Sequence, residues 1–139
     1  MSQQSFVIIN DFIGVPVWRM FNVENIIQLA HDNARNFAAE GIDISEVIGS
    51  KNQLCAAVRE VVSRQIKWSR MKVDPKFYRW DKLAPNVQMR LIKELSTQYP
   101  FLDYFEDNFG AITLLQHHIN SKASDEVRRR KHEREVRKL

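Results

Sequence analysis

The stretch NVENIIQLAHDNARNFAAEG, residues 22–41, is the part of the sequence that decides the fold class. Its apolar residues recur every three or four positions, which places them on one face of an α-helix with the polar residues opposite. Asn22 is a favoured N-cap residue, Glu24 stands in the first turn, and Gly41 is placed to end the helix. We therefore predict a helix from Asn22 to about Glu40. Its apolar face comprises Val23, Ile26, Ile27, Ala30, Ala34, Phe37 and Ala38.

Helical spacing continues along the rest of the chain, which has only four Gly and four Pro. Two further helix starts are indicated. Asp43 and Glu46 have the spacing of a capping box, and Pro85 stands where proline is common in the first turn of a helix. The apolar arc of the helix that follows Ser50 is wide enough to contact neighbours on two sides, and we expect Trp68 on that arc to be buried. The sequence thus predicts an all-α domain of about five to six helices. The further helices are expected at 43–49, 50–71, 86–98, 101–107 and 110–135.

The chain is predicted to divide into three parts. Residues 1–72 form an N-terminal helical lobe, in which 5–10 (SFVIIN) are a short strand or an extended packing arm. Residues 73–123 form a tri-helical lobe, and 124–139 form a basic helical extension. The last helix is expected to leave the body near Lys122, because beyond it the apolar residues form no stripe.

Composition bounds the class of protein. The 139 residues are 44% hydrophobic and 27% charged, which is typical of an ordinary globular domain. A single cysteine, Cys55, cannot form an internal disulfide, which favours a reducing compartment. The N-terminus lacks a signal peptide or membrane-spanning pattern, so we expect an intracellular protein with no membrane association, nuclear if the source is eukaryotic.

Charge is concentrated at the C-terminal end. Residues 121–139 hold eight Lys/Arg and four Asp/Glu, a surplus of four that equals the net charge of the whole chain. The last twelve residues are RRRKHEREVRKL (128–139). Ion pairs in which an acid precedes a base by four residues (acid-first pairs) are expected between Glu126 and Arg130, Asp125 and Arg129, and Glu133 and Arg137. Such a segment is open to three interpretations: phosphate contacts, a nuclear address, or the solvated end of a helix.

A smaller basic stripe lies on the outer face of the predicted helix 50–71 and would extend the basic surface if both faced the same way. The candidate nucleic-acid-binding residues are Arg128, Arg129, Arg130, Lys131, Arg134, Arg137, Lys138, Arg59, Lys67 and Arg70.

Eight aromatic residues fall between positions 77 and 109. One interpretation is that some of them are exposed and form a protein interface, since exposed aromatics bordered by charge are typical of interfaces. The alternative is that they form the core between the lobes. The candidate partner-binding residues are Phe77, Tyr78, Trp80, Tyr104 and Trp18.

The sequence contains none of the short motifs that mark common enzymes, nucleotide sites or zinc sites. His117 and His118 are adjacent and so about 100° apart on a helix, which suits two ligands of one metal poorly; we expect His118 to be partly buried and His117 exposed. Cys55 falls on an apolar arc and is expected to be inert. We therefore predict no catalytic residue, no metal site and no cofactor.

The helices expected at 86–98, 101–107 and 110–135 resemble in outline a tri-helical helix-turn-helix domain. The third predicted helix has no tryptophan, unlike a homeodomain or a Myb repeat, so no family is assigned. The polar side chains of this helix that could contact DNA bases are Gln116, His117 and Asn120. The sequence favours a non-enzymatic accessory or regulatory subunit that associates with nucleic acid or chromatin through its basic C-terminal helix, within a protein complex. The alternative is a protein-binding adaptor or a homo-oligomerisation module with no nucleic-acid contact.

Overall fold

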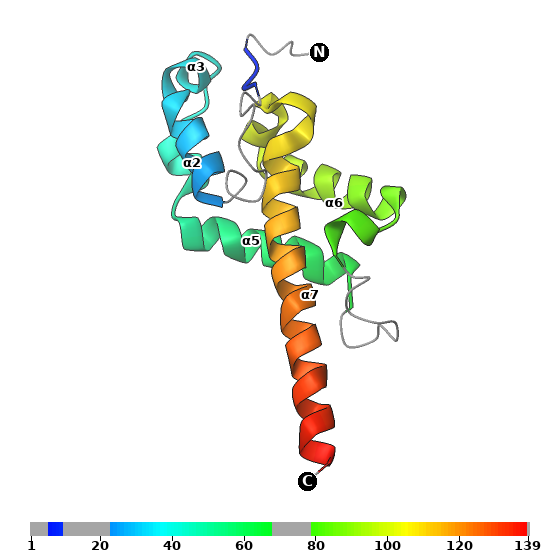
Figure 1. Cartoon of the computed structure of the whole chain (residues 1–139). Coiled ribbons are helices and arrows are strands. Elements are labelled where there is room, and N and C mark those ends of the chain that lie inside the picture. The colour runs from blue at the N-terminus through cyan, green and yellow to red at the C-terminus, as the bar shows by residue number, and fades with distance from the viewer. Residues whose placement is uncertain (1–5, 10–22, 68–78, 139) are drawn as a thin grey trace.

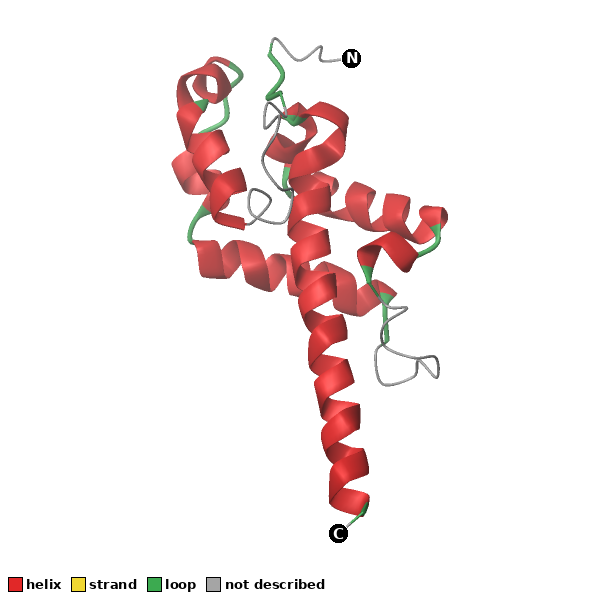
Figure 2. Cartoon of the chain, viewed as in Figure 1, coloured by secondary structure: helices red, strands yellow, loops and turns green. Residues whose placement is uncertain are grey.

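The computed structural model describes residues 6–9, 23–67 and 79–138 (Figure 1). These residues form α-helices joined by turns and short 3₁₀ segments, with no strand in the described ranges (Figure 2). The prediction of an all-α domain of about five to six helices is confirmed. The α-helices are α2 (Val23–Asp32), α3 (Ala34–Ala39), α4 (Ile44–Ile48), α5 (Lys51–Gln65), α6 (Pro85–Gln98) and α7 (Phe109–Arg137), and the 3₁₀ segments are η3 (Trp80–Lys82), η4 (Pro100–Tyr104) and η5 (Glu106–Asn108).

The helix predicted from Asn22 to Glu40 is two helices, and Ala34 and Ala38 of its predicted apolar face are exposed, so that prediction is wrong in two respects. The break is at Asn33, whose side-chain amide donates a hydrogen bond to the Leu29 carbonyl at 2.8 Å. Asparagine competes in this way with the helical hydrogen-bond ladder, because its short amide reaches nearby backbone groups. Gly41 has a φ of +80°, as expected of a residue that ends a helix.

The start of α5 follows its sequence signals, but its end does not. Ser50 and Gln53 form a reciprocal capping box at the start. The helix ends at Gln65 and not at the predicted residue 71: Ile66 leaves it with extended backbone angles, and its side chain is buried in the core. The predicted burial of Trp68 concerns a position outside the described residues.

The first half of α7 is the centre of the fold. It packs against α2, α5 and α6, and it carries fully buried side chains such as Leu114, Leu115 and Ile119. The buried residues from both predicted lobes belong to one hydrophobic cluster, which extends from Ile8 to Ile119. The lobe boundaries themselves stay a prediction.

The described N-terminal residues 6–9 are an extended arm, as one of the two sequence interpretations had it. The backbone N–H of Ile8 donates to the Tyr104 carbonyl at 2.7 Å, and the Glu106 N–H donates to the Ile8 carbonyl at 2.9 Å, which forms one parallel bridge. Ile8 is buried, whereas Val7 and Ile9 are exposed. The arm therefore ties the beginning of the described chain to the turn that precedes α7.

That turn differs in kind from the α-helix predicted at 101–107. It consists of the 3₁₀ segments η4 and η5, and two residues of η5, Asp107 (φ 49°) and Asn108 (φ 61°), have left-handed backbone angles. Left-handed residues end a helical run, and asparagine and aspartate tolerate the conformation better than most residues. The break predicted near 108–110 lies at Asp107 and Asn108, because α7 already begins at Phe109.

Candidate nucleic-acid interface

The second half of α7 leaves the body of the protein, as predicted. Ala123 is the last buried residue, and every described residue from 124 to 138 is partly or fully exposed. In Figure 1 this is the orange-to-red end of the helix, which extends well beyond α5 and α6. No helix among the described residues is long and apolar enough to cross a membrane. We call residues 124–138 the tail helix.

Acidic and basic side chains pair along one side of the tail helix. Glu126 contacts both Arg129 and Arg130, and the Arg130 pair, at 3.2 Å, is one of the acid-first pairs predicted. The other two predicted pairs are wrong: Asp125 pairs with Arg128, and Glu133 pairs with Arg129 at 2.6 Å. Partners three and four positions apart are both within reach on a helix, so the spacing does not decide between them.

The pairing shifts the titration of the groups involved. Hydrogen bonding and charge attraction from Glu126 raise the pKa of Arg129, and Glu133 adds to this. The hydrogen bond from Arg129 lowers the pKa of Glu126, against the opposing effect of partial burial. Both groups therefore stay charged at neutral pH, and the cluster Arg128, Arg129 and Arg130 is compensated by its own acids.

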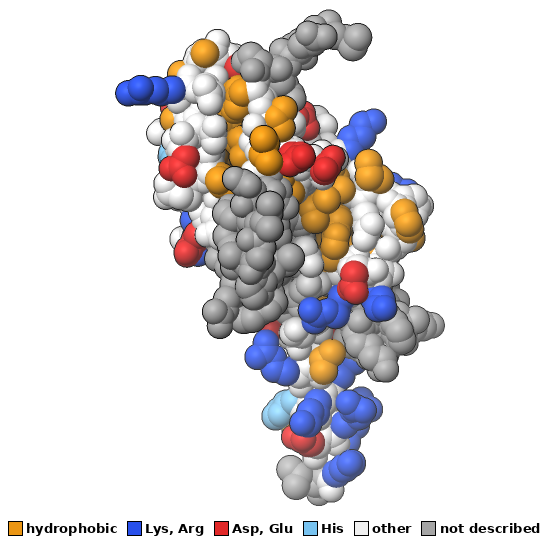
Figure 3. All heavy atoms as spheres, turned by 45° about the horizontal axis from the view of Figure 1, so that its top comes forward, with side chains coloured by type: hydrophobic (Ala, Val, Ile, Leu, Met, Phe, Trp, Pro, Cys, Tyr) orange, Lys and Arg blue, Asp and Glu red, His pale blue; other side chains and the backbone are white. Residues whose placement is uncertain are grey.

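Four other cations of the tail helix are exposed and form no ion pair among the described residues: Lys131, Arg134, Arg137 and Lys138. At about 100° per residue, Lys131, Arg134 and Lys138 share one face of the helix, roughly opposite Arg129 and Glu133. Glu135 borders this face but does not pair with it in the described structure. Figure 3 shows Lys and Arg side chains gathered along the tail helix. We call Lys131, Arg134 and Lys138 the open face.

Two of the three basic residues predicted on the helix 50–71, Arg59 and Lys67, are among the described residues. Arg59 of α5 and Lys122 of α7 both lie close enough to His118 to lower its pKa. Lys67 donates its ammonium to the Ser63 carbonyl at 2.9 Å and thereby satisfies the end of α5. Arg70 lies outside the described residues.

His118 is half-buried and His117 is exposed, as predicted. Both line a small hollow of about 180 Å³ between α5 and α7, which Cys55 also lines. No group of three His, Cys, Asp or Glu side chains in the described ranges is arranged to hold a metal ion. Burial lowers the pKa of His118 below its ordinary value of 6.5, and the cations Lys122 and Arg59, with His117, lower it further.

We expect the protein to lose stability as the pH falls from about 6.5, because the unfolded chain then binds a proton at His118 more readily than the folded protein does. The loss ends once the pH is below the pKa of His118 in the folded state. Urea unfolding at about pH 7.5 and about pH 5 checks this for the protein and for His118→Gln, which should lose less stability between the two. His117→Gln is the matched control, and an unchanged pH dependence in His118→Gln would contradict the assignment.

The predicted partner-binding aromatics that the structure describes contribute to the core. Trp80 is 8% exposed, and its backbone N–H donates to the Asn120 side-chain oxygen at 2.9 Å. Tyr104 is partly buried, stacked on Phe6 with ring centroids 4.8 Å apart. Phe77, Tyr78 and Trp18 lie outside the described residues, and a partner contact by any of the five stays a prediction. Asn120, which the sequence suggested as a residue that contacts bases, uses its side-chain oxygen to accept this hydrogen bond from Trp80.

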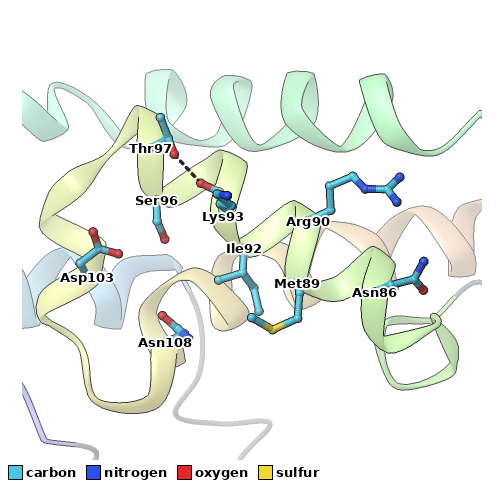
Figure 4. Close-up of a pocket in the computed structure, with 9 residues that line it drawn as sticks. All are labelled: Asn86, Met89, Arg90, Ile92, Lys93, Ser96, Thr97, Asp103 and Asn108. Atoms are coloured by element: carbon cyan, nitrogen blue, oxygen red, sulfur yellow. Dashed lines mark hydrogen bonds between the residues drawn. The ribbon is translucent and has the colours of Figure 1, made fainter.

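A hollow of about 490 Å³ lies along the outer face of α6, and sequence reasoning did not find it (Figure 4). Residues of η4, η5 and α6 line it together, and Asp103 and Asn108 lie on the side toward which Ser96 points, a proximity that no sequence motif encodes. The Ser96 hydroxyl is buried without a hydrogen bond of normal geometry, although it lies near enough to Asp103 to act on that carboxyl. Partial burial raises the pKa of Asp103 and outweighs this effect. Polar side chains and the exposed Met89 line the hollow. Its lining does not carry the excess of positive charge that the tail helix has.

No family model, no curated protein and no solved structure matches this chain.

Proposed function

We propose that this protein is a non-enzymatic accessory subunit that associates with nucleic acid through the tail helix. The observation that carries the proposal is that α7 extends out of the core with exposed cations that no acid within the described structure compensates. A fixed array of cations binds a polyanion by releasing the counterions condensed on its phosphates.

The chemistry of this surface favours phosphate contacts over the reading of bases. Lysine and arginine side chains without a fixed hydrogen-bonding framework position a protein on the backbone, whereas specificity requires contacts to base edges. Asn120, one of the two amide side chains of α7, already accepts the hydrogen bond from Trp80. We therefore expect association that is strongly salt-dependent and nearly independent of sequence.

The test is a salt titration of binding to a random duplex DNA of about 20 base pairs. The protein is compared with a full-length variant in which all seven candidate cations from Arg128 to Lys138 are replaced by glutamine. Salt-dependent binding that the variant lacks is the expected result. Unchanged binding by the variant, or no binding by the protein at low salt, would refute the proposal.

The alternative function, a protein-binding adaptor, is favoured by one observation: the exposed apolar side chains of Val7 and Ile9 on the arm and of Met89 on α6. In that case the tail helix contributes solubility or acts as a nuclear address. The same titration separates the two functions, because an adaptor of this kind does not retain duplex DNA at any salt concentration.

A further inference from the structure

The tail helix has two sides with different charge states, although the sequence alone presents one continuous basic run. On one side Asp125, Glu126 and Glu133 hold Arg128, Arg129 and Arg130 in ion pairs. On the other, the open face of Lys131, Arg134 and Lys138 has no such partner among the described residues. An arginine that already contacts a carboxylate must give up that contact before it binds a phosphate, so it adds less to affinity than an unpaired cation.

The shape of the open face matches a groove of duplex DNA. Its three cations are spaced along about 10 Å of helix, at 1.5 Å per residue. An α-helix with its side chains is about 10–12 Å wide, and the major groove of B-form DNA is about 12 Å wide and admits one. Cations along one side of such a helix reach the phosphates that border the groove.

Two other kinds of nucleic acid fit this surface less well. The major groove of A-form RNA is deep and narrow, so a helix does not enter it. Proteins that hold single strands without sequence preference stack bases on aromatic side chains, and the sequence from Gly110 to Leu139 contains no Phe, Tyr or Trp.

We infer that the ligand of the tail helix is double-stranded B-form DNA and that the open face, Lys131, Arg134 and Lys138, makes the phosphate contacts, while Arg128, Arg129 and Arg130 contribute little. This inference rests on the proposed function and adds to it the class of nucleic acid and the contacting side of the helix. Glu135, which borders the open face, opposes binding.

The test compares two full-length variants with equal loss of charge. One carries Lys131→Gln, Arg134→Gln and Lys138→Gln; the other carries Arg128→Gln, Arg129→Gln and Arg130→Gln. Removing three phosphate contacts lowers the slope of log affinity against log salt by about 2.7, so the first variant should bind duplex DNA at least about 100-fold more weakly at roughly 0.1 M salt. The second should bind within about tenfold of the original protein, with a slope changed by less than about 1.

Glu135→Gln provides a gain-of-binding variant that keeps the tail helix intact. It should bind duplex DNA several-fold more tightly, because it removes the acid beside the open face. Circular dichroism of every variant verifies the helix content. A variant that loses helix is replaced by its single substitutions, for which the same ranking is expected.

The ligands are a duplex DNA, a duplex RNA and a single-stranded DNA of one sequence and length. Tighter binding of the duplex DNA than of the other two supports the inference. Equal or tighter binding of RNA or of the single strand overturns the choice of ligand, and equal losses in the two triple variants overturn the choice of face; neither result affects the proposed function. Absence of binding to all three by the original protein overturns the proposed function as well.

Discussion

Replacing Phe37 by alanine is expected to lower the free energy of unfolding by about 3–5 kcal/mol, a large part of the 5–15 kcal/mol typical of a domain. The Phe37 side chain is fully buried. Its ring meets Phe6 and Tyr104 edge to face, with centroid distances of 4.9 and 5.1 Å, and lies 6.3 Å from Phe101. Alanine would remove these contacts and leave a cavity between α3, the arm and η4.

Urea unfolding followed by circular dichroism measures this loss. Phe37→Leu is the conservative variant and should lose clearly less, because it fills most of the space. Arg35→Ala, on the exposed side of the same helix, is the surface control and should change stability by about 0.5 kcal/mol or less. A loss below about 1 kcal/mol for Phe37→Ala would show that Phe37 is not packed as described.

Replacing Gly110 by valine is expected to lower the free energy of unfolding by about 1–3 kcal/mol. A Cβ atom at this position would lie 2.8 Å from Cγ and 2.9 Å from Cδ2 of the Phe105 ring, closer than side chains approach. Phe105 is itself buried, and the parallel bridge to Ile8 fixes its backbone, so the ring has little room to move. Gly110→Ala should lose stability by a smaller amount, although alanine is otherwise favoured over glycine in a helix by about 1 kcal/mol.

A double-mutant cycle with Phe105→Ala, which removes the Cγ and Cδ atoms that the new Cβ would meet, tests the cause of that loss. If the Phe105 ring is what valine strikes, Gly110→Val should cost much less in the Phe105→Ala background, with a coupling of about 1 kcal/mol or more between the two positions. Additive effects would show that the cost arises elsewhere in the first turn of α7.

Local signals in the sequence predicted the elements whose causes are themselves local. Pro85 begins α6, Asp43 accepts the backbone N–H of Glu46 at the start of α4, and Ser50 caps α5. Each depends on residues within a few positions of one another, which the sequence displays directly. The split at Asn33 is also local, but it depends on whether an asparagine side chain turns to its own backbone or to solvent, and the residue type permits both.

What the sequence did not predict depends on contacts across the fold. Trp80 is buried, and its backbone N–H donates to the side chain of Asn120, 40 positions away. The hollow on α6 is lined also by residues of the two 3₁₀ segments η4 and η5. In the tail helix, which arginines are paired with acids depends on whether each acid binds a partner three or four positions away. The free energies of these two kinds of pair differ by only a few tenths of a kcal/mol.

The continuity of α7 has a consequence for the cooperativity of the tail helix. Starting a helix in water is unfavourable, with a nucleation constant of about 10⁻³, which corresponds to about 4 kcal/mol. In this protein the segment packed in the core, Phe109 to Ala123, is already helical, so the residues that follow need only propagate the helix. A separate peptide with the sequence of the tail would have to nucleate its own. A ligand that requires the helical arrangement of Lys131, Arg134 and Lys138 therefore distinguishes the folded protein from the unfolded chain, even though it never touches the core.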